Sequence, residues 1–373
     1  ITNFGWVVFC SRSHIIDNDK NNIKTDGEVV MAKRRLGLSY LLVASAALLL
    51  SGCATVYKPL GWVISSYSKD EVVPYALAHP DAEVSICGTG EGLTQFVGSF
   101  GRVIKDPNYT LFYTELLTGF CAESRAYESH LRYLRASHQN QTTIARDELM
   151  LAQRWHAIAA ERRVRAVNFM TARYGDIGGD TCPNLFKDED EITYLLGLVT
   201  ALQAVRSDLL SGAQVGVRRD LAARTMRSSQ CLDNEKWWGV PQAIRSTVWA
   251  FVPGTLPKNQ NLWQNYQGAD AIAKKHDALF PVVLHVLGAD NHGNEDEVRR
   301  ALRTAGEIQR NIASGNHKFP AMYQLVNAIS HDQLRYMADA IWMEQKGHRS
   351  PPKSLGEFPD EAKRAPADID GLL

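Results

Sequence analysis

Apolar side chains recur at helical intervals along most of the chain, and strand-like alternation is scarce. Over residues 108–137 the apolar positions are spaced mainly by three, four or seven, which predicts a long amphipathic helix. A second pattern over 142–174, ended by Gly175, predicts another helix. Its packing stripe comprises Leu151, Trp155, Ile158, Ala159, Arg162, Ala166 and Phe169. Because only a short connection separates the two helices, we expect an antiparallel pair.

Helical patterns continue in the C-terminal half. Turn-forming residues gather at 176–184, so the segment 176–187 is a candidate subdivision of the domain. The acids at 188–191 are typical of a helix start, and the apolar run 194–210 predicts a buried helix. Further helices are expected at 217–231, 241–252, 262–278, 294–312 and 320–346, and the run 280–287 fits a helix or a strand. The predicted fold class is all-α, with antiparallel helix pairs stacked as a tetratricopeptide-like curved array or an irregular bundle.

A glycine-rich segment, Gly88-Thr89-Gly90-Glu91-Gly92, follows an alternating stretch at 82–87. It resembles a phosphate-binding loop, but the spacing lacks the third glycine and no βαβ unit follows. We interpret it as a turn that leads into a helix over 93–103.

A bacterial secretion signal is indicated near the N-terminus. A basic triplet at 33–35 precedes an apolar run of fifteen residues at 36–50, and small residues then lead to Cys53. A transmembrane helix is the alternative, but it needs roughly 20 residues. The residues Leu50-Ser51-Gly52-Cys53 resemble a lipobox, which implies cleavage before Cys53 and acylation of its thiol. Because Ala54 follows instead of an aspartate, the resemblance implies a lipid anchor on the periplasmic face of the bacterial outer membrane.

This signal sets the expected domain boundaries. Met31 stands directly before the basic triplet, so residues 1–30 are expected to be a non-native upstream extension, with a genuine N-terminal extension as the alternative. Residues 31–52 form the expected signal peptide, and 53–346 form the expected all-helical periplasmic domain. Residues 347–373 carry several prolines and scattered charges and are expected to be a flexible tail.

Charge and cysteine content narrow the class of protein. The chain has 41 Lys and Arg against 41 Asp and Glu. This balance gives no excess of positive charge that would favour binding to nucleic acid. Four cysteines besides Cys53 lie in the expected periplasmic domain, where disulfides persist, and three pairings are open to them. We favour Cys87 with Cys121 and Cys182 with Cys231, because each bond would tie a loop to a neighbouring helix. Buried, unpaired cysteines are the alternative.

The sequence contains no motif that predicts an enzyme, a cofactor or a metal site. The histidines lack zinc-type pairing, and no serine has a nucleophile-elbow setting. The acidic segment 290–297 has oxygen donors but lacks the ligand order of an EF-hand, so we interpret Asn294 as a helix cap. Glu115 and Glu123 are the acids that an enzyme would use first, and we interpret both as solvated charges on a helix face.

Tryptophan is concentrated between positions 237 and 263, where four of the eight in the chain lie. Such aromatic side chains either fill a helical core or line a recognition surface. Core packing is the interpretation that ordinary aromatic burial favours. The candidates for ligand or partner contacts are Trp237, Trp238, Trp249, Trp263 and Tyr266.

The features together resemble one known family. The lipobox, the helix over 108–137, a second helix with Arg162-Arg163-Val164-Arg165-Ala166, and the following Tyr194-Leu195-Leu196-Gly197-Leu198 look like the T component of TRAP (tripartite ATP-independent periplasmic) transporters. The likeness covers roughly residues 53–254. It implies tetratricopeptide-like helix pairs around a groove or pore, a homo-oligomer, and pairing with a periplasmic solute-binding protein. No segment carries the full 34-residue repeat signature, so irregular pairs are also compatible with the pattern.

We therefore expect a lipid-anchored periplasmic protein that acts by binding and not by catalysis, and that contacts the membrane through Cys53. One alternative is a structural or assembly lipoprotein of the envelope, which predicts a filled core around Trp249. The other is a cell-envelope enzyme, which predicts a pocket that holds a carboxylate or histidine with a strongly perturbed pKa.

Overall fold

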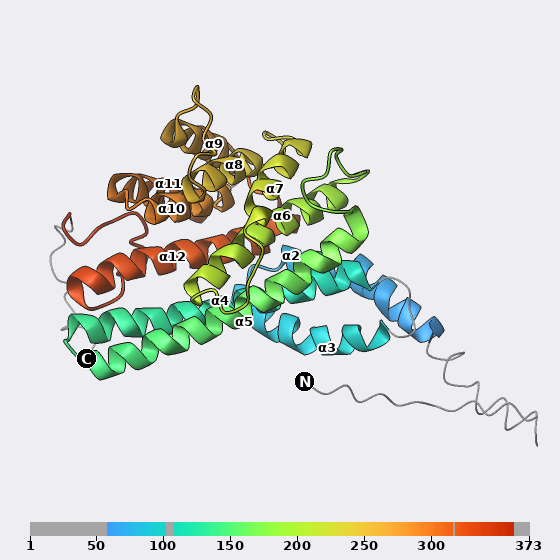
Figure 1. The fold of residues 1–373 in the computed structure, drawn as a ribbon, viewed down its shortest axis with the longest axis horizontal. Coiled ribbons are helices and arrows are strands. Elements are labelled where there is room, and N and C mark those ends of the chain that lie inside the picture. The colour runs from blue at the N-terminus through green and yellow to red at the C-terminus, as the bar shows by residue number, and fades with distance from the viewer. Residues whose placement is uncertain (1–57, 102–106, 316–317, 362–373) are drawn as a thin grey trace, which may run out of the picture. The chain divides into compact units, whose positions relative to one another are not determined.

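The computed structural model describes residues 58–101, 107–315 and 318–361. Its contacts divide the chain after Tyr57, and the unit described here is Lys58–Leu373. Cys53, the expected signal peptide and the upstream extension lie outside the described residues. In the described part of the chain every regular element is helical, so the all-α prediction is confirmed (Figure 1).

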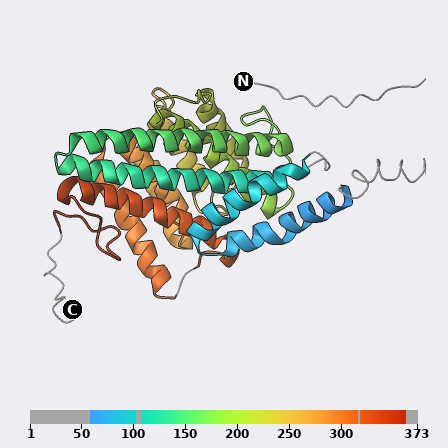
Figure 2. The same cartoon turned by 90° about the horizontal axis from the view of Figure 1, so that it is seen from below.

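The N-terminal part consists of short helices followed by a long pair. Residues 58–67 are helical and lead into a π-helical turn. The elements that follow are η1 (Ser68–Val72), α2 (Val73–Ala78), η2 (Val84–Thr89), α3 (Gly90–Phe100), α4 (Asn108–His138) and α5 (Thr142–Tyr174). The helices α4 and α5 match the two long helices that the apolar spacing predicts, and they pack along each other as an antiparallel pair (Figure 2).

The C-terminal part adds a second set of helices. These are α6 (Asp188–Leu210), α7 (Asp220–Ser228), η3 (Ser229–Cys231), α8 (Val240–Phe251), α9 (Leu262–His276), α10 (Phe280–Asn291), α11 (Glu295–Ala313), η4 (Ala321–Tyr323) and α12 (Gln324–Lys346). The acids at 188–191 lie in the first turn of α6, as expected. The side chain of Asn294 accepts a hydrogen bond from the backbone N–H of Glu297 and caps α11, as predicted. The undecided run 280–287 is helical and belongs to α10.

The helices pack in two groups, and the largest cluster of buried side chains includes residues from both. In the first group α5 contacts both α4 and α6, and α12 also packs on α4. In the second group α10 contacts α8, α9, α11 and α12. Every residue from Phe280 to Ala289 is buried, because other helices surround α10. This position explains why the segment is apolar on all sides and shows little helical periodicity.

Both favoured disulfides are present. Cys87 in η2 is bonded to Cys121 in α4, with the two Cα atoms 5.0 Å apart. Cys182, in the loop after α5, is bonded to Cys231 in η3, with the Cα atoms 5.5 Å apart. The expected tie between a loop and a helix holds for the second bond, whereas the first connects two helical segments.

The glycine-rich segment differs from its predicted structure. Residues 84–89 form a π-helix, and α3 begins at Gly90, so the segment is not a turn. A Cβ atom at position 90 would lie 3.0 Å from the Cβ of Leu117 and 3.0 Å from the backbone nitrogen of Thr118. The glycine therefore permits a close approach of α3 to α4. A glycine-rich pattern is compatible with such a helix contact as well as with a turn.

The C-terminal segment 347–361 packs on the protein, although the sequence predicts a flexible tail from residue 347. The side chain of Phe358 is 1 % exposed. The guanidinium groups of Arg299 and Arg303 lie 4.7 and 5.2 Å from the centre of its ring. The same arginines form ion pairs with Asp360 and Glu361. The composition of the segment is typical of a tail, but the buried ring of Phe358 and these ion pairs hold it against α11.

Candidate functional site

The tryptophan-rich segment lies mainly in the core. Trp237 and Trp238 are 2 % and 3 % exposed, and Tyr266 is fully buried. Trp249 and Trp263 are partly buried and pack against the small apolar cluster that includes Tyr266. Trp237, Trp238 and Tyr266 therefore contribute to packing, as the core interpretation expects, and they do not form an open recognition surface.

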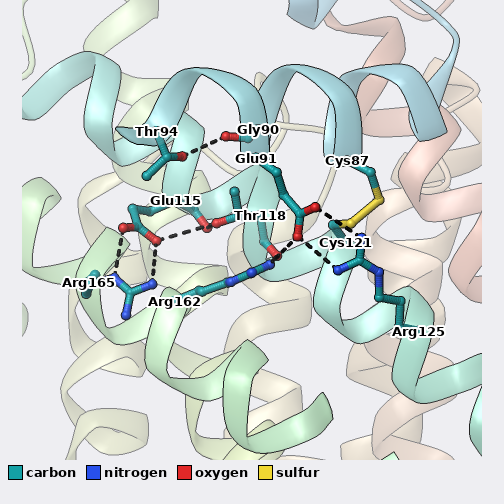
Figure 3. A network of polar contacts seen from close by, with 10 residues as sticks. All are labelled: Cys87, Gly90, Glu91, Thr94, Glu115, Thr118, Cys121, Arg125, Arg162 and Arg165. Atoms are coloured by element: carbon teal, nitrogen blue, oxygen red, sulfur yellow. Dashed lines mark hydrogen bonds and ion pairs between the residues drawn. A yellow bond between two sulfur atoms is a disulfide. The ribbon is translucent and has the colours of Figure 1, made fainter. Parts of the chain in front are cut away.

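A groove of about 1270 Å³ lies between α3, α4 and α5. We call it the α3–α4–α5 groove. Its charged lining consists of Glu91 from α3, Glu115 from α4, and Arg162 and Arg165 from α5. Its apolar lining includes Leu111 and Phe169. Figure 3 shows the acids and arginines that meet there.

Glu91 is held by two arginines from different helices. Both terminal nitrogens of Arg125 donate to its carboxylate, each at 3.0 Å, and Nη1 of Arg162 donates to Oε1 at 3.0 Å (Figure 3). Nη1 of Arg162 also donates to the carbonyl oxygen of Thr118 at 2.7 Å. The hydrogen bonds from Arg125 are the largest cause of a lowered pKa for Glu91. Glu91 is consequently ionised at neutral pH.

The Cys87–Cys121 disulfide lies next to this ion pair. Glu91 follows Cys87 by four residues, and Arg125 follows Cys121 by four residues. Each interval is close to one helical turn, so the bond fixes the register of α3 against α4 near the point where Glu91 meets Arg125 (Figure 3).

Glu115 forms the second charged contact of the groove. Its side chain is 7 % exposed and accepts hydrogen bonds from Nε and Nη2 of Arg165 at 2.8 and 3.1 Å. The hydroxyl of Thr118 donates to the backbone carbonyl of Glu115 at 3.0 Å. Arg165 itself is 48 % exposed. The buried acid therefore orients a guanidinium group that remains accessible from the groove.

The arrangement can accommodate a further anion. Arg165 uses Nε and Nη2 in its hydrogen bonds to protein, and Arg162 uses Nη1, within the described residues. A guanidinium group has five N–H donors, so both arginines retain donors. Three arginines face two carboxylates in this network, which leaves an excess of one positive charge. Planar, charge-assisted recognition of a carboxylate by arginine fits this chemistry.

A buried ion pair outside the groove lining connects four helices. Arg163 and Glu123 are 1 % and 3 % exposed and form two hydrogen bonds of 3.0 and 2.6 Å. Nη1 of Arg163 also donates to the hydroxyl of Ser207 on α6, and the amide of Gln333 on α12 donates to Glu123 at 2.9 Å. Burial opposes ionisation of Glu123, but the charge and hydrogen bonds of Arg163 outweigh it and lower its pKa to about 2. These contacts give the pair a structural role.

Aromatic side chains surround this buried pair. The rings of Tyr127 and Tyr336 are stacked with centroids 3.8 Å apart, and Tyr127 accepts a hydrogen bond from Arg206 at 3.4 Å. Burial lowers the pKa of the neighbouring His156 to about 3, so its imidazole is neutral at physiological pH.

The two acids on α4 differ from their predicted environment. Glu115 and Glu123 are interpreted from the pattern as solvated charges, but both are buried and paired because α5 places arginines opposite them. A signal was present at Arg162, which falls on the predicted packing stripe of residues 142–174. A charged residue on such a stripe indicates a partner on the facing helix.

Within the described ranges, no group of three or more His, Cys, Asp or Glu side chains is placed to hold a metal ion. In the same residues, no helix combines the length and apolar character needed to cross a membrane.

Comparison with known proteins gives no match. No family model, no curated protein and no solved structure is significantly similar to this chain.

Proposed function

We propose that this chain is a lipid-anchored periplasmic protein of the bacterial outer membrane, and that it binds an organic anion in the α3–α4–α5 groove. The observation that carries the binding role is the pair Arg162 and Arg165, which present unused N–H donors to a groove of about 1270 Å³. The apolar lining by Leu111 and Phe169 favours a ligand that has an apolar part next to its carboxylate.

The proposed location draws support from two separate features. The lipobox-like segment ends at Cys53, and the four cysteines of the following domain are paired in two disulfides. Disulfides are typical of oxidising compartments such as the periplasm and are rare in the cytosol. Acylation of Cys53 would confine the protein to a membrane surface and raise its effective concentration for periplasmic partners.

The binding role can be tested by calorimetric titration of the mature chain, which begins at residue 53 and carries Cys53→Ala to keep it free of lipid. The probes are succinate, phenylacetate and decanoate, with 2-phenylethanol as a neutral analogue of phenylacetate. We expect at least one acid to bind, the neutral analogue to bind at least tenfold more weakly, and Arg165→Gln to weaken acid binding about tenfold. The control is Arg154→Gln, an exposed arginine on the same helix. Equal effects of the two substitutions, or binding of none of the three acids, would refute this role.

An accessory role in TRAP-type solute uptake is the more specific form of this proposal. It is supported by the resemblance in helix layout, and it includes a periplasmic solute-binding protein as partner and a homo-oligomer as the assembled state. The partner can be tested by affinity purification from the native periplasmic extract, with the mature chain as bait. Recovery of a solute-binding protein supports the TRAP role, and recovery of envelope-assembly proteins alone contradicts it.

One observation favours a second candidate function, a structural or assembly lipoprotein without a small ligand. Trp237, Trp238 and Tyr266 are buried, and Trp249 packs against an apolar cluster, as that alternative expects. The titration described above separates the two candidates, because an assembly protein has no reason to prefer an acid over its neutral analogue.

A further inference from the structure

Exposed apolar side chains are densest in the first helical segment of the described chain. Leu60, Trp62, Val63 and Tyr67 are 46 %, 68 %, 53 % and 62 % exposed. Leu60, Val63 and Tyr67 are separated by three and four residues, so they share one face of the helix, and Trp62 widens the exposed apolar surface to about 160° around the helix. Monomeric soluble proteins seldom leave contiguous apolar patches uncovered, and such patches mark sites of interaction.

The opposite side of this segment packs on the protein. Gly61 and Ser68, seven residues apart, are both buried. In Figures 1 and 2 the segment projects from one end of the helical body. Two faces of one short helix thus have different surroundings, one in contact with protein and one apolar and uncovered.

The chain length between this segment and Cys53 limits what can cover the apolar face. Four residues lie between Cys53 and Lys58, where the described helix begins. The five Cα–Cα steps from Cys53 to Lys58 span at most about 18 Å even when fully extended. If the thiol of Cys53 carries lipid, the start of the helix is therefore held within about 18 Å of the lipidated thiol, close enough for its apolar face to reach the membrane surface.

The residue types on this face suit a membrane interface. Tryptophan and tyrosine are enriched where hydrocarbon meets water, because their rings are apolar and each carries one polar hydrogen-bonding group. Trp62 and Tyr67 both have this character, and Leu60 and Val63 supply purely apolar surface between them. A second copy of the chain could cover the same face. The short connection to Cys53 favours the membrane, because it keeps a lipid surface close to this end of the protein.

We infer that the face formed by Leu60, Trp62, Val63 and Tyr67 lies in the lipid interface beside the acylated Cys53. This inference rests on the anchor in the proposed function. The acyl chains would hold the protein at the membrane, and the helix face would add a second contact that fixes how the body is oriented over the lipid surface. The α3–α4–α5 groove would then keep a constant orientation relative to the membrane.

Vesicle flotation tests the lipid contact without the acyl chains. The mature chain from residue 53, with Cys53→Ser, is exported to the periplasm so that both disulfides form, and is mixed with vesicles of phosphatidylethanolamine and phosphatidylglycerol. We expect a fraction of the protein to float with the vesicles. We also expect Trp62→Ala to lower the partition coefficient about tenfold and Trp62→Ala/Tyr67→Ala to lower it further. Phe186→Ala is the matched control, because Phe186 is 84 % exposed and lies in the loop before α6, and it should have no effect.

Each other outcome overturns the inference. If no protein floats, or if Phe186→Ala weakens flotation as much as Trp62→Ala, the helix face does not bind lipid. If the protein instead forms a dimer that Trp62→Ala abolishes and that does not float, a second copy covers the face. Mass spectrometry of the N-terminal peptide of the full chain from bacterial membranes tests the anchor separately. An unmodified Cys53 overturns the anchor, whereas the flotation result alone decides the lipid contact.

Discussion

Substitution of Arg163 by methionine removes the cation that neutralises Glu123 inside the protein. Because the two side chains are 1 % and 3 % exposed, water cannot replace the lost partner. Removal of one member of a buried ion pair typically costs about 3–5 kcal/mol, since the remaining charge is left uncompensated. The double variant Arg163→Met/Glu123→Leu removes that charge as well and should recover at least half of the loss.

The same pair predicts how stability depends on pH. The pKa of Glu123 is about 2 in the folded protein, against an ordinary value of 4.5. A lowered folded-state pKa contributes stability that is fully present above the ordinary value and is lost as the pH falls towards the folded value. With about 1.4 kcal/mol for each pKa unit, the contribution is about 3 kcal/mol and disappears between about pH 4.5 and pH 2.

Urea unfolding followed by circular dichroism, with the disulfides intact, measures both effects. The Arg163→Met variant should lose about 3–5 kcal/mol at pH 7, and the double variant should show a flatter dependence on pH below 4.5 than the unaltered chain. The control is Arg218→Met, because Arg218 is 71 % exposed and its pairing with Asp220 is screened by water. A loss below about 1 kcal/mol for Arg163→Met, or a double variant as unstable as the single one, would show that the unpaired charge of Glu123 does not destabilise the fold.

Three further predictions concern other parts of the fold. A Cβ on Gly306 would overlap the backbone carbonyl of Leu355, so Gly306→Ala should destabilise the chain by about 1–3 kcal/mol in urea unfolding and expose the segment 347–361 to protease. An unchanged stability and a segment 347–361 that stays resistant to protease would contradict this. Gly98→Ala is the control, because the nearest atom to a Cβ at that position is 3.9 Å away. Replacement of both Cys182 and Cys231 by serine should cost up to about 4 kcal/mol, as the entropy of the 49-residue loop requires, and an unchanged urea midpoint would contradict it. Asn294→Ala should cost about 1 kcal/mol and Asn294→Asp much less, because only the first removes the cap of α11; equal losses in thermal unfolding would argue against the cap.

Long-range periodicity was sufficient to predict the long helices. The apolar positions of α4 and α5 recur over eight or more turns, so one misplaced residue does not hide the pattern. The cap at Asn294 could be predicted because capping depends only on neighbouring residues. The disulfide pairing could be favoured from the predicted order of loops and helices, although the sequence alone left three pairings open.

Features that depend on contacts between distant segments could not be predicted in the same way. Gly90 lies in a helix, and a glycine fits there because Leu117 and Thr118, on another helix, leave little room for a side chain. The segment 347–361 is ordered because Phe358 meets two arginines of α11. Glu115 is buried because Arg165 lies opposite it on α5. In each case the local composition is compatible with two structures, and tertiary packing selects one.

The proposed function requires that a chain anchored through Cys53 holds an organic anion on Arg165. Native mass spectrometry of the protein extracted from bacterial membranes tests both parts in one measurement. We expect the mass of a chain that begins at Cys53 with its acyl groups, together with a bound organic acid that is lost in the Arg165→Gln variant. A chain without acyl groups and without a bound acid, or an acid that Arg165→Gln retains, would contradict the claim.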